Sequence, residues 1–105
     1  MLLGKVVGTL VSSRKDEKLV GLKFLVLQRL DIEGELQSGY VVAADAVGAG
    51  VGEVVMYASG SSARQTVVTD RRPCDAVVMG IVDTWEVNGE VKYQKERWEG
   101  EMAEV

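Results

Sequence analysis

The side chains of this sequence that could carry chemistry are one cysteine and a few aspartates. There is no histidine, which removes the commonest general base and the commonest metal ligand. Cys74 is the single cysteine, and it would need a histidine, a cation or a helix N-terminus beside it to act as a nucleophile. Arg71 and Arg72 are near enough in the sequence to lower the pKa of this thiol. Because free cysteines are more often buried and inert, we expect a packed structural thiol.

The aspartates Asp70, Asp75 and Asp83 could form a carboxylate pair or a weak metal site. A proline and an apolar run separate them, so their spacing favours neither arrangement. We therefore expect no bound metal ion, no cofactor and no enzymatic activity.

The most glycine-dense stretch is residues 45–64, which read DAVGAGVGEVVMYASGSSAR. A Walker-type phosphate loop places Lys and Ser or Thr directly after its last glycine, whereas here Gly52 is followed by Glu53, whose charge would repel a phosphate. The dinucleotide-binding fingerprint also fails, because the spacing is G-x-G-x-G and a strand-like run follows instead of a helix. The stretch predicts a turn with positive φ angles at a place where chains pack closely.

The apolar content of the chain is mostly Val, Leu, Ala and Ile, which is typical of strands. We expect strands over residues 2–13, 23–31, 39–44, 53–58, 76–87 and 90–93. Gly4 and Gly8 indicate that the first strand is strongly bent, and Asn88-Gly89 predicts a tight hairpin turn before the last.

The connections between these strands are expected to be short. Residues 32–38 read as a turn or loop, and residues 59–65 could hold one helical turn with Ser61 or Ser62 as its N-cap. Residues 71–73 are expected to be extended, because the residue before a proline avoids the helical region. Five or six short strands with one helical turn predict an all-β fold, a small closed or nearly closed barrel.

A chain of 105 residues is expected to form one domain, with the barrel over residues 1–94 and an acidic, fraying tail over residues 95–105. The strands at 23–31 and 76–87 are apolar on both faces, so both faces should be buried. The chain is too short to cover a sheet with helices, so a neighbouring subunit is the expected second cover.

The composition excludes several classes of partner. A net charge of −4 argues against bulk electrostatic binding of nucleic acid, although Arg14, Lys15, Lys18 and Lys23 could form a local basic patch. No apolar run approaches 18 residues, so we expect no membrane span. The first residues lack a basic region followed by a long apolar core, so we expect no secretory signal. A lone cysteine suits a reducing cytoplasm.

Four segments, in order and spacing, resemble the pentameric vertex proteins of bacterial microcompartment shells, the EutN/CcmL type. They are LGKVVGTLVSSRKDEKLVGLK, VGAGVGE, SGSSAR and PCDAVVMGIVD, and together they cover most of residues 1–84. The resemblance implies a barrel of the oligonucleotide-binding (OB) type that assembles into a homopentamer. It also implies hexameric shell tiles as partners and a location in the shell of a cytoplasmic microcompartment.

The resemblance and the glycine density together suggest where subunits meet. The residues expected at a subunit interface or near the five-fold axis are Gly48, Ala49, Gly50, Gly52, Glu53, Ser61, Ser62 and Arg64. Three glycines within five residues exceed what a hairpin turn needs, so a bulky side chain at Gly50 should harm the ring more than the fold. Glu53 is the expected ionic partner of Arg64, within or between chains.

The charged segment at 14–19 is a second candidate surface. Arg14, Lys15 and Lys18 are expected to contact neighbouring shell tiles if the segment acts as it would in the family. A solvated hairpin connection is the alternative for this segment.

Two functions from different classes remain. In the first, five copies form a pentagonal unit that closes the vertices of a polyhedral shell, because hexagonal tiles alone make flat sheets. The second is an OB-type nucleic-acid-binding barrel, which needs a basic groove and an aromatic stacking face. The chain is acidic and has one Phe, and Trp85 and Trp98 are expected to pack rather than bind bases. The sequence therefore favours the structural function.

Overall fold

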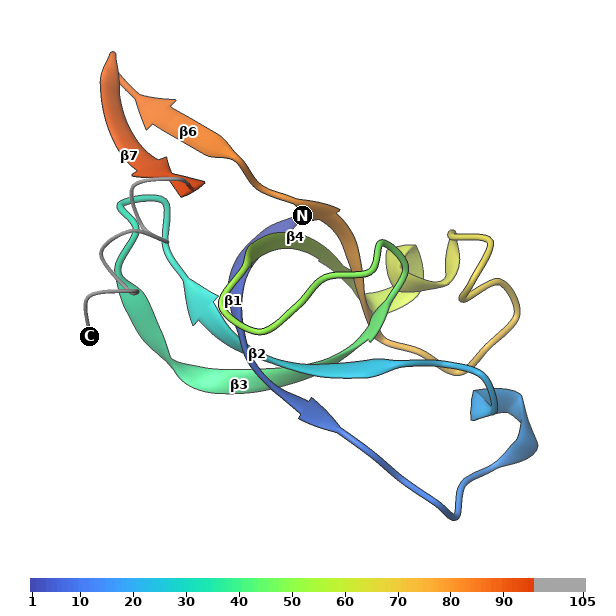
Figure 1. Ribbon diagram of the computed structural model, residues 1–105. Helices are drawn as coiled ribbons and strands as arrows, with labels where there is room; N and C mark the ends of the chain where they lie inside the picture. The colour runs from blue at the N-terminus through green and yellow to red at the C-terminus, as the bar shows by residue number, and fades with distance from the viewer. Residues whose placement is uncertain (96–105) are drawn as a thin grey trace.

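The computed structural model describes residues 1–95, which contain seven strands and two short 3₁₀ turns. In chain order these are β1 (Leu2–Leu10), η1 (Glu17–Leu19), β2 (Phe24–Leu30), β3 (Leu36–Asp45), β4 (Val54–Ser59), η2 (Gly60–Arg64), β5 (Ala76–Ile81), β6 (Thr84–Val87) and β7 (Glu90–Gln94). Five strands close a barrel in the order β1-β2-β3-β5-β4, while β6 and β7 form a separate hairpin (Figure 1). The expected small all-β barrel with a C-terminal hairpin is confirmed.

Strand β1 is shared by two antiparallel ladders, one with β2 and one with β4. Its register with β2 shifts between Val6 and Gly8, where the sequence predicted a bend. A Cβ added at Gly4 would lie only 3.2 Å from Cε1 of Tyr57, so this position requires the close approach that glycine allows. The barrel closes through β3 and β5, its only parallel pair within residues 1–95.

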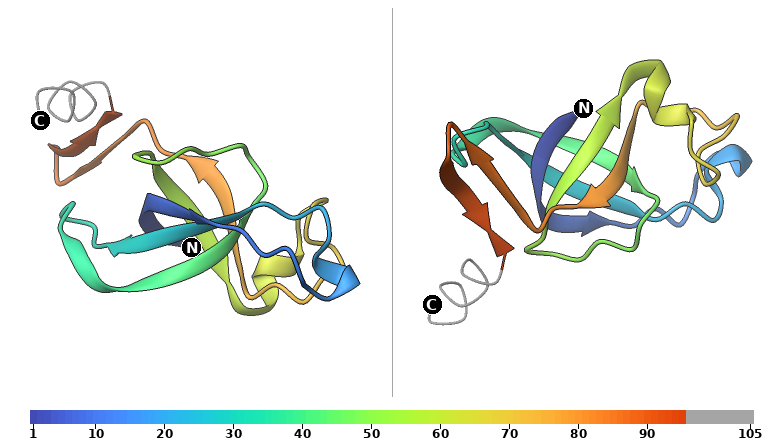
Figure 2. Two further views of the ribbon diagram at one scale, coloured as in Figure 1. Left: turned by 60° about the horizontal axis from the view of Figure 1, so that its bottom comes forward. Right: turned by 90° about the horizontal axis from the view of Figure 1, so that it is seen from above.

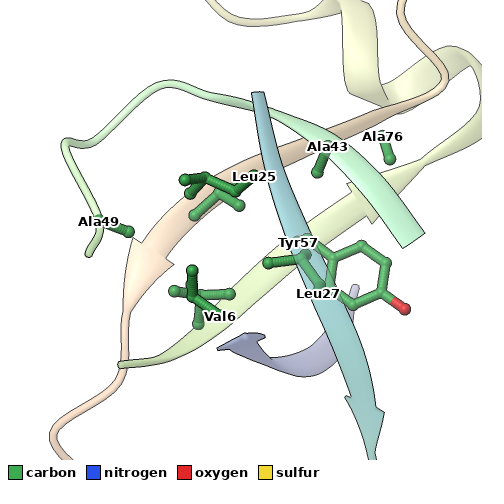
Figure 3. Close-up of a cluster of buried hydrophobic side chains, with 9 residues drawn as sticks. Val6, Leu25, Leu27, Ala43, Ala49, Tyr57 and Ala76 are labelled. Atoms are coloured by element: carbon green, nitrogen blue, oxygen red, sulfur yellow. The ribbon is translucent and has the colours of Figure 1, made fainter. Parts of the chain in front are cut away.

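The interior of the barrel is filled by aliphatic side chains around the ring of Tyr57 (Figure 3). The buried members of this cluster are Val6, Leu25, Leu27, Ala43, Ala49, Val55, Tyr57, Ala76 and Val78. The small Ala43 and Ala76 share the cluster with the large tyrosine ring, which balances the volume inside the barrel. Burying a side chain such as Leu25 contributes about 1.5–3 kcal/mol, so this cluster is the main source of stability.

Strand β2 has the two apolar faces that its sequence predicted. Leu25 and Leu27 are fully buried inside the barrel, whereas Phe24 and Val26 are half-buried on the outer side. Within one chain the outer face is therefore incompletely covered. Its burial by a neighbouring subunit stays a prediction.

Two strand boundaries differ from expectation around the first loops. The predicted strand at 2–13 ends at Leu10, and β3 begins at Leu36 instead of residue 39. The turn before β3 is compact because Oδ1 of Asp31 accepts hydrogen bonds from the backbone N–H groups of Glu33 and Glu35, each at 2.9 Å. This compact turn lets β3 begin earlier than the predicted loop over 32–38 would allow.

The predicted strand at 76–87 is two strands, β5 and β6, because the chain leaves the barrel between them. Val82 N–H still donates to the Val54 carbonyl at 2.8 Å, on the barrel side. The carbonyl of Asp83 instead accepts from Lys95 N–H at 2.8 Å, on the hairpin side. The pairing partner therefore changes within two residues.

The helical content also departs from the prediction of one turn. Turn η1 is additional and is capped by Asp16, whose Oδ1 accepts from Lys18 N–H at 2.9 Å. Turn η2 lies where one was expected, but its N-cap is Ser59, so the prediction of Ser61 or Ser62 as the cap is wrong. No helix within residues 1–95 is long and apolar enough to cross a membrane.

The segment at 71–73 is not extended throughout. Arg71 has φ of 58°, in the left-handed region, so that prediction is wrong at this residue. The backbone turns there because Arg72 N–H donates to the Thr69 carbonyl at 3.0 Å and Cys74 N–H donates to the Arg72 carbonyl at 2.8 Å.

The β6–β7 hairpin turns at Asn88-Gly89 as predicted, with φ of 52° and 79° at the two residues. The Trp85 ring stacks on Tyr93 with centroids 5.0 Å apart, and its indole N–H donates to the Ile32 carbonyl at 2.8 Å. Tyr93 is buried in a cluster with Leu30 and Val54 of the barrel. Trp85 therefore packs, as expected, while Trp98 and the tail from residue 96 lie outside the described residues.

Candidate assembly surfaces

The glycine turn, residues 45–53, connects β3 to β4 and is organised by a buried carboxylate. The side chain of Asp45 is 2% exposed. Its Oδ1 accepts from the N–H groups of Val47 and Gly48 at 3.0 Å and from Ala49 at 3.3 Å. The ammonium of Lys23 lies 3.7 Å from the other oxygen of Asp45, so the buried charge is compensated.

Glu53 organises the far end of the same turn. Its Oε1 accepts the Gly50 N–H at 2.6 Å, and its Oε2 accepts from Nζ of Lys95 at 2.8 Å. The Lys95 hydrogen bond, followed by that of Gly50, holds the pKa of Glu53 below its usual value, against the opposing effect of burial. Because Lys95 follows β7, this ion pair links the glycine turn to the C-terminal hairpin.

The three glycines of the turn are not equivalent. Gly48 and Gly52 have positive φ angles of 77° and 95°, which non-glycine residues rarely adopt. Gly50 does not, and a Cβ added to it would meet Oε1 of Glu53 at an ordinary 3.5 Å. The expectation of positive φ is therefore wrong at Gly50. Gly52 is also tied to β1, because its N–H donates to the Val6 carbonyl at 2.8 Å.

The second half of the predicted interface, η2, lies at the opposite end of β4 (Figure 2). Ser61, Ser62 and Arg64 are exposed, whereas Ala63 is fully buried beneath them. Within one chain the fold therefore separates these residues from the glycine turn, and Glu53 pairs with Lys95 instead of Arg64. Whether the two sets meet between chains stays a prediction.

The charged segment at 14–19 follows β1 and includes η1. Arg14, Lys15 and Lys18 are all exposed there, and Nζ of Lys15 donates to the Ser12 carbonyl at 2.8 Å. Their exposure is compatible with contact to a neighbouring tile, which the structure of one chain does not test.

The fold also assembles a cluster that sequence reasoning missed. Lys18, Arg64, Arg71, Arg72 and Pro73 line one open pocket of about 260 Å³, which we call the basic pocket. Two adjacent arginines before a proline were the available signal. Arg64 lies in the same β4–β5 connection as these arginines, whereas nothing in the sequence links them to Lys18, which reaches the pocket from the β1–β2 connection.

Cys74 is packed, as expected for a structural thiol. It is 8% exposed, and burial raises its pKa despite the nearby charge of Arg72. Within residues 1–95, no group of three or more His, Cys, Asp or Glu side chains is placed to hold a metal ion.

Comparison with known proteins places this geometry in a family. The family model described as ethanolamine utilisation protein EutN/carboxysome matches residues 1–83. The carboxysome shell vertex protein CcmL of Gloeobacter violaceus is 50% identical over 95 residues, which cover 90% of this chain and 95% of that protein.

Solved structures agree with this match. The structure of Gloeobacter violaceus CcmL superposes with a TM-score of 0.88 at 49% identity, covering 91% of this chain and 99% of that one. The pentameric microcompartment shell protein GrpN from Rhodospirillum rubrum superposes with a TM-score of 0.76 at 48% identity, covering 83% of this chain and 99% of that one. The match in sequence and in fold extends over the whole barrel, and the chain belongs to the EutN/CcmL family.

Proposed function

We propose that this chain is a structural shell protein, five copies of which form a ring at the vertices of a polyhedral bacterial microcompartment. The observation that carries the proposal is the likeness to GrpN, described as a pentameric shell protein, at 48% identity and over 83% of this chain. The named relatives are shell vertex proteins of carboxysomes and other microcompartments. Hexagonal tiles alone form flat sheets, so a closed shell needs pentagonal units at its corners.

A five-membered ring needs two different surfaces on each subunit, because each copy meets the next head to tail. The chain offers two exposed apolar surfaces on different strands. The first, which we call the tyrosine face, is the outer side of β2 and β3. Val26 lies opposite Val42 in register there, and Tyr40 and Val42 remain 67% and 45% exposed.

The second surface is an apolar pocket of about 230 Å³ between the start of β1, β4 and the hairpin. It is lined by Met1, Leu2, Leu3, Ile32, Met56, Val82, Thr84 and Trp85. We propose that the tyrosine face of one copy packs against this region of the next. Burial of both surfaces would supply the cover that the outer side of β2 lacks in one chain.

Hexameric shell tiles are the proposed partners of the ring, with Arg14, Lys15 and Lys18 among the contacting side chains. The proposed location is the shell of a cytoplasmic microcompartment. The role proposed is structural and not enzymatic, which agrees with the burial of Cys74 and its raised pKa. The nucleic-acid-binding alternative needs an aromatic platform. Within residues 1–95 the exposed aromatic side chain is Tyr40, because Tyr57 and Tyr93 are buried and Phe24 and Trp85 are half-buried.

The experiment is to assemble shells from hexameric tile proteins with and without this chain and to image them by electron microscopy. We expect closed polyhedra when it is present and open sheets or tubes when it is absent. Val42→Lys, on the tyrosine face, should abolish closure, whereas Val91→Lys, at a comparably exposed valine of the hairpin, should not. Closed shells in the absence of the chain would argue against a vertex role.

A further inference from the structure

The basic pocket gathers four cations from two connections of the chain. Both connections lie at the end of the molecule away from the β6–β7 hairpin (Figure 2). Lys18 comes from η1, Arg64 ends η2, and Arg71 and Arg72 lie in the connection from β4 to β5. No carboxylate of residues 1–95 lines the pocket. The chain has 12 Lys and Arg residues and a net charge of −4, so a third of its cations concentrate on one concave site. Such a site attracts anions.

These four charges are not neutralised within the described chain. The salt bridges of residues 1–95 are made by Lys23, Lys92 and Lys95, and none involves a cation of the basic pocket. The cations of the basic pocket therefore repel one another, because like charges lie close together there without a counterion. A bound anion would relieve that repulsion.

The pocket is built on fixed backbone. Nη1 of Arg72 donates to the Val20 carbonyl at 2.7 Å, which ties the β4–β5 connection to the β1–β2 connection. Thr69, fully buried, accepts at its carbonyl from Arg72 N–H, and its hydroxyl lies 2.6 Å from that of Thr66. The hydrogen bond to Val20 uses one guanidinium N–H of Arg72 and leaves the others for a ligand. Preorganised donors of this kind lose little conformational entropy on binding.

Arg71 is held in an unusual conformation at the edge of this site. Its φ of 58° is uncommon for a residue other than glycine, asparagine or aspartate, and such backbone persists where the surrounding structure imposes it. The turn that imposes it also brings Arg71 to the same pocket as Arg64 and Lys18.

From this geometry we propose that the basic pocket binds a small, multiply charged oxyanion, of the class of free phosphate-bearing compounds. Guanidinium groups present planar pairs of donors that match phosphate oxygens, and Lys18 adds a compact positive charge. A volume of about 260 Å³ suits one or two phosphate groups and not a folded partner. All the residues that line the pocket come from one chain.

The test is isothermal titration calorimetry of the intact protein, at low salt, with inorganic phosphate and inorganic pyrophosphate. We expect saturable binding of pyrophosphate at one site per chain. Arg64→Gln and Arg71→Asn should each weaken it by about tenfold, because each removes a charged hydrogen bond. Asparagine tolerates the left-handed backbone, so Arg71→Asn should fold normally. Arg14→Gln removes a charge that lies in the same β1–β2 connection as Lys18 but does not line the pocket. It should change the affinity for pyrophosphate by less than about twofold.

Three results would overturn the proposal: no saturable heat with either anion, equal weakening by Arg14→Gln and Arg64→Gln, or binding seen only with a single-stranded oligonucleotide. The last would assign the pocket to a nucleic-acid backbone. The oligomeric mass of each variant is measured alongside, so that loss of the anion site is distinguished from loss of the ring.

Discussion

The two ends of strand β4 differ in how their charged side chains are paired. At the glycine turn, the carboxylates of Asp45 and Glu53 accept backbone N–H groups and pair with Lys23 and Lys95. At the basic pocket, the cations have no carboxylate partner within residues 1–95. The polar groups of the glycine turn, the motif that stands out in the sequence, are thus largely paired within the fold. The cations without a carboxylate partner lie at the other end, which sequence patterns did not indicate as a site.

The largest effect should come from removing the carboxylate that organises the glycine turn. Asp45→Ala leaves three N–H groups without their acceptor and removes the ionic partner of Lys23, so we expect a loss of about 3 kcal/mol in the free energy of unfolding. Asp16→Ala, which removes the exposed cap of η1, should cost about 0.5–1 kcal/mol. Urea unfolding at one fixed protein concentration measures both. Similar losses for the two variants would erase the contrast between the ends of β4.

The glycines of the turn should differ among themselves. Gly52→Ala forces a side chain into a φ of 95° and should cost about 1–2 kcal/mol, whereas Gly50→Ala should cost less than about 0.5 kcal/mol. Thermal unfolding followed by circular dichroism makes the comparison. A greater cost at Gly50 would mean that the backbone angles do not explain why glycine is there.

Gly50→Val then separates the fold from the ring. Since the barrel has room for a Cβ at Gly50, the variant should keep its circular dichroism spectrum. If subunits converge at the glycine turn, as expected from the sequence, the ring should be lost. An intact ring in this variant would place the glycine turn away from the interface.

The ion pair between Glu53 and Lys95 should make the glycine turn sensitive to acid. The pKa of Glu53 is lowered below 4.5 in the folded chain, so the unfolded state takes up its proton first as the pH falls. The stability supplied by Glu53 is therefore complete above the unfolded pKa and is lost as the pH falls through the folded pKa. Unfolding midpoints between about pH 6 and pH 3 should show a shallower decline in Glu53→Gln than in the exposed variant Glu86→Gln. Parallel declines would indicate that other carboxylates dominate.

A small effect is also expected at Cys74, which follows Pro73 of the basic pocket. Its pKa is raised by burial, so its contribution is present below the usual thiol value of 9.0 and is lost as the pH rises through the folded value. Cys74→Ala should cost about 1 kcal/mol or less, remove that alkaline loss and leave shell assembly unchanged. A variant that folds and forms rings but is excluded from shells would give the thiol a role that packing does not explain.

The sequence predicted the elements better than the contacts between them. Strand periodicity located β2, β4 and the hairpin turn at Asn88-Gly89, because local side-chain patterns determine these features. It did not locate the break between β5 and β6, which depends on whether Val54 or Lys95 is the pairing partner. The sequence did not predict the basic pocket for the same reason, since Lys18 and Arg72 become neighbours only when the β1–β2 and β4–β5 connections meet.

The candidate interface shows the same limit. The sequence suggested Glu53 and Arg64 as a pair within or between chains, yet within one chain β4 separates them and Glu53 pairs with Lys95. Spacing in the sequence carried no information about Lys95, which arrives from β7. Contacts between chains are even harder to predict from the sequence, because they depend on the symmetry of the assembly.

The most direct test of the central claim is the mass of the purified protein by native mass spectrometry at micromolar concentration. A homopentamer predicts about 57 kDa, five times the mass of an 11.4 kDa chain, with few smaller species. Val42→Lys should shift the protein toward the monomer, and Val91→Lys should leave the pentamer intact. A stable, folded monomer of the unmodified protein would contradict the account.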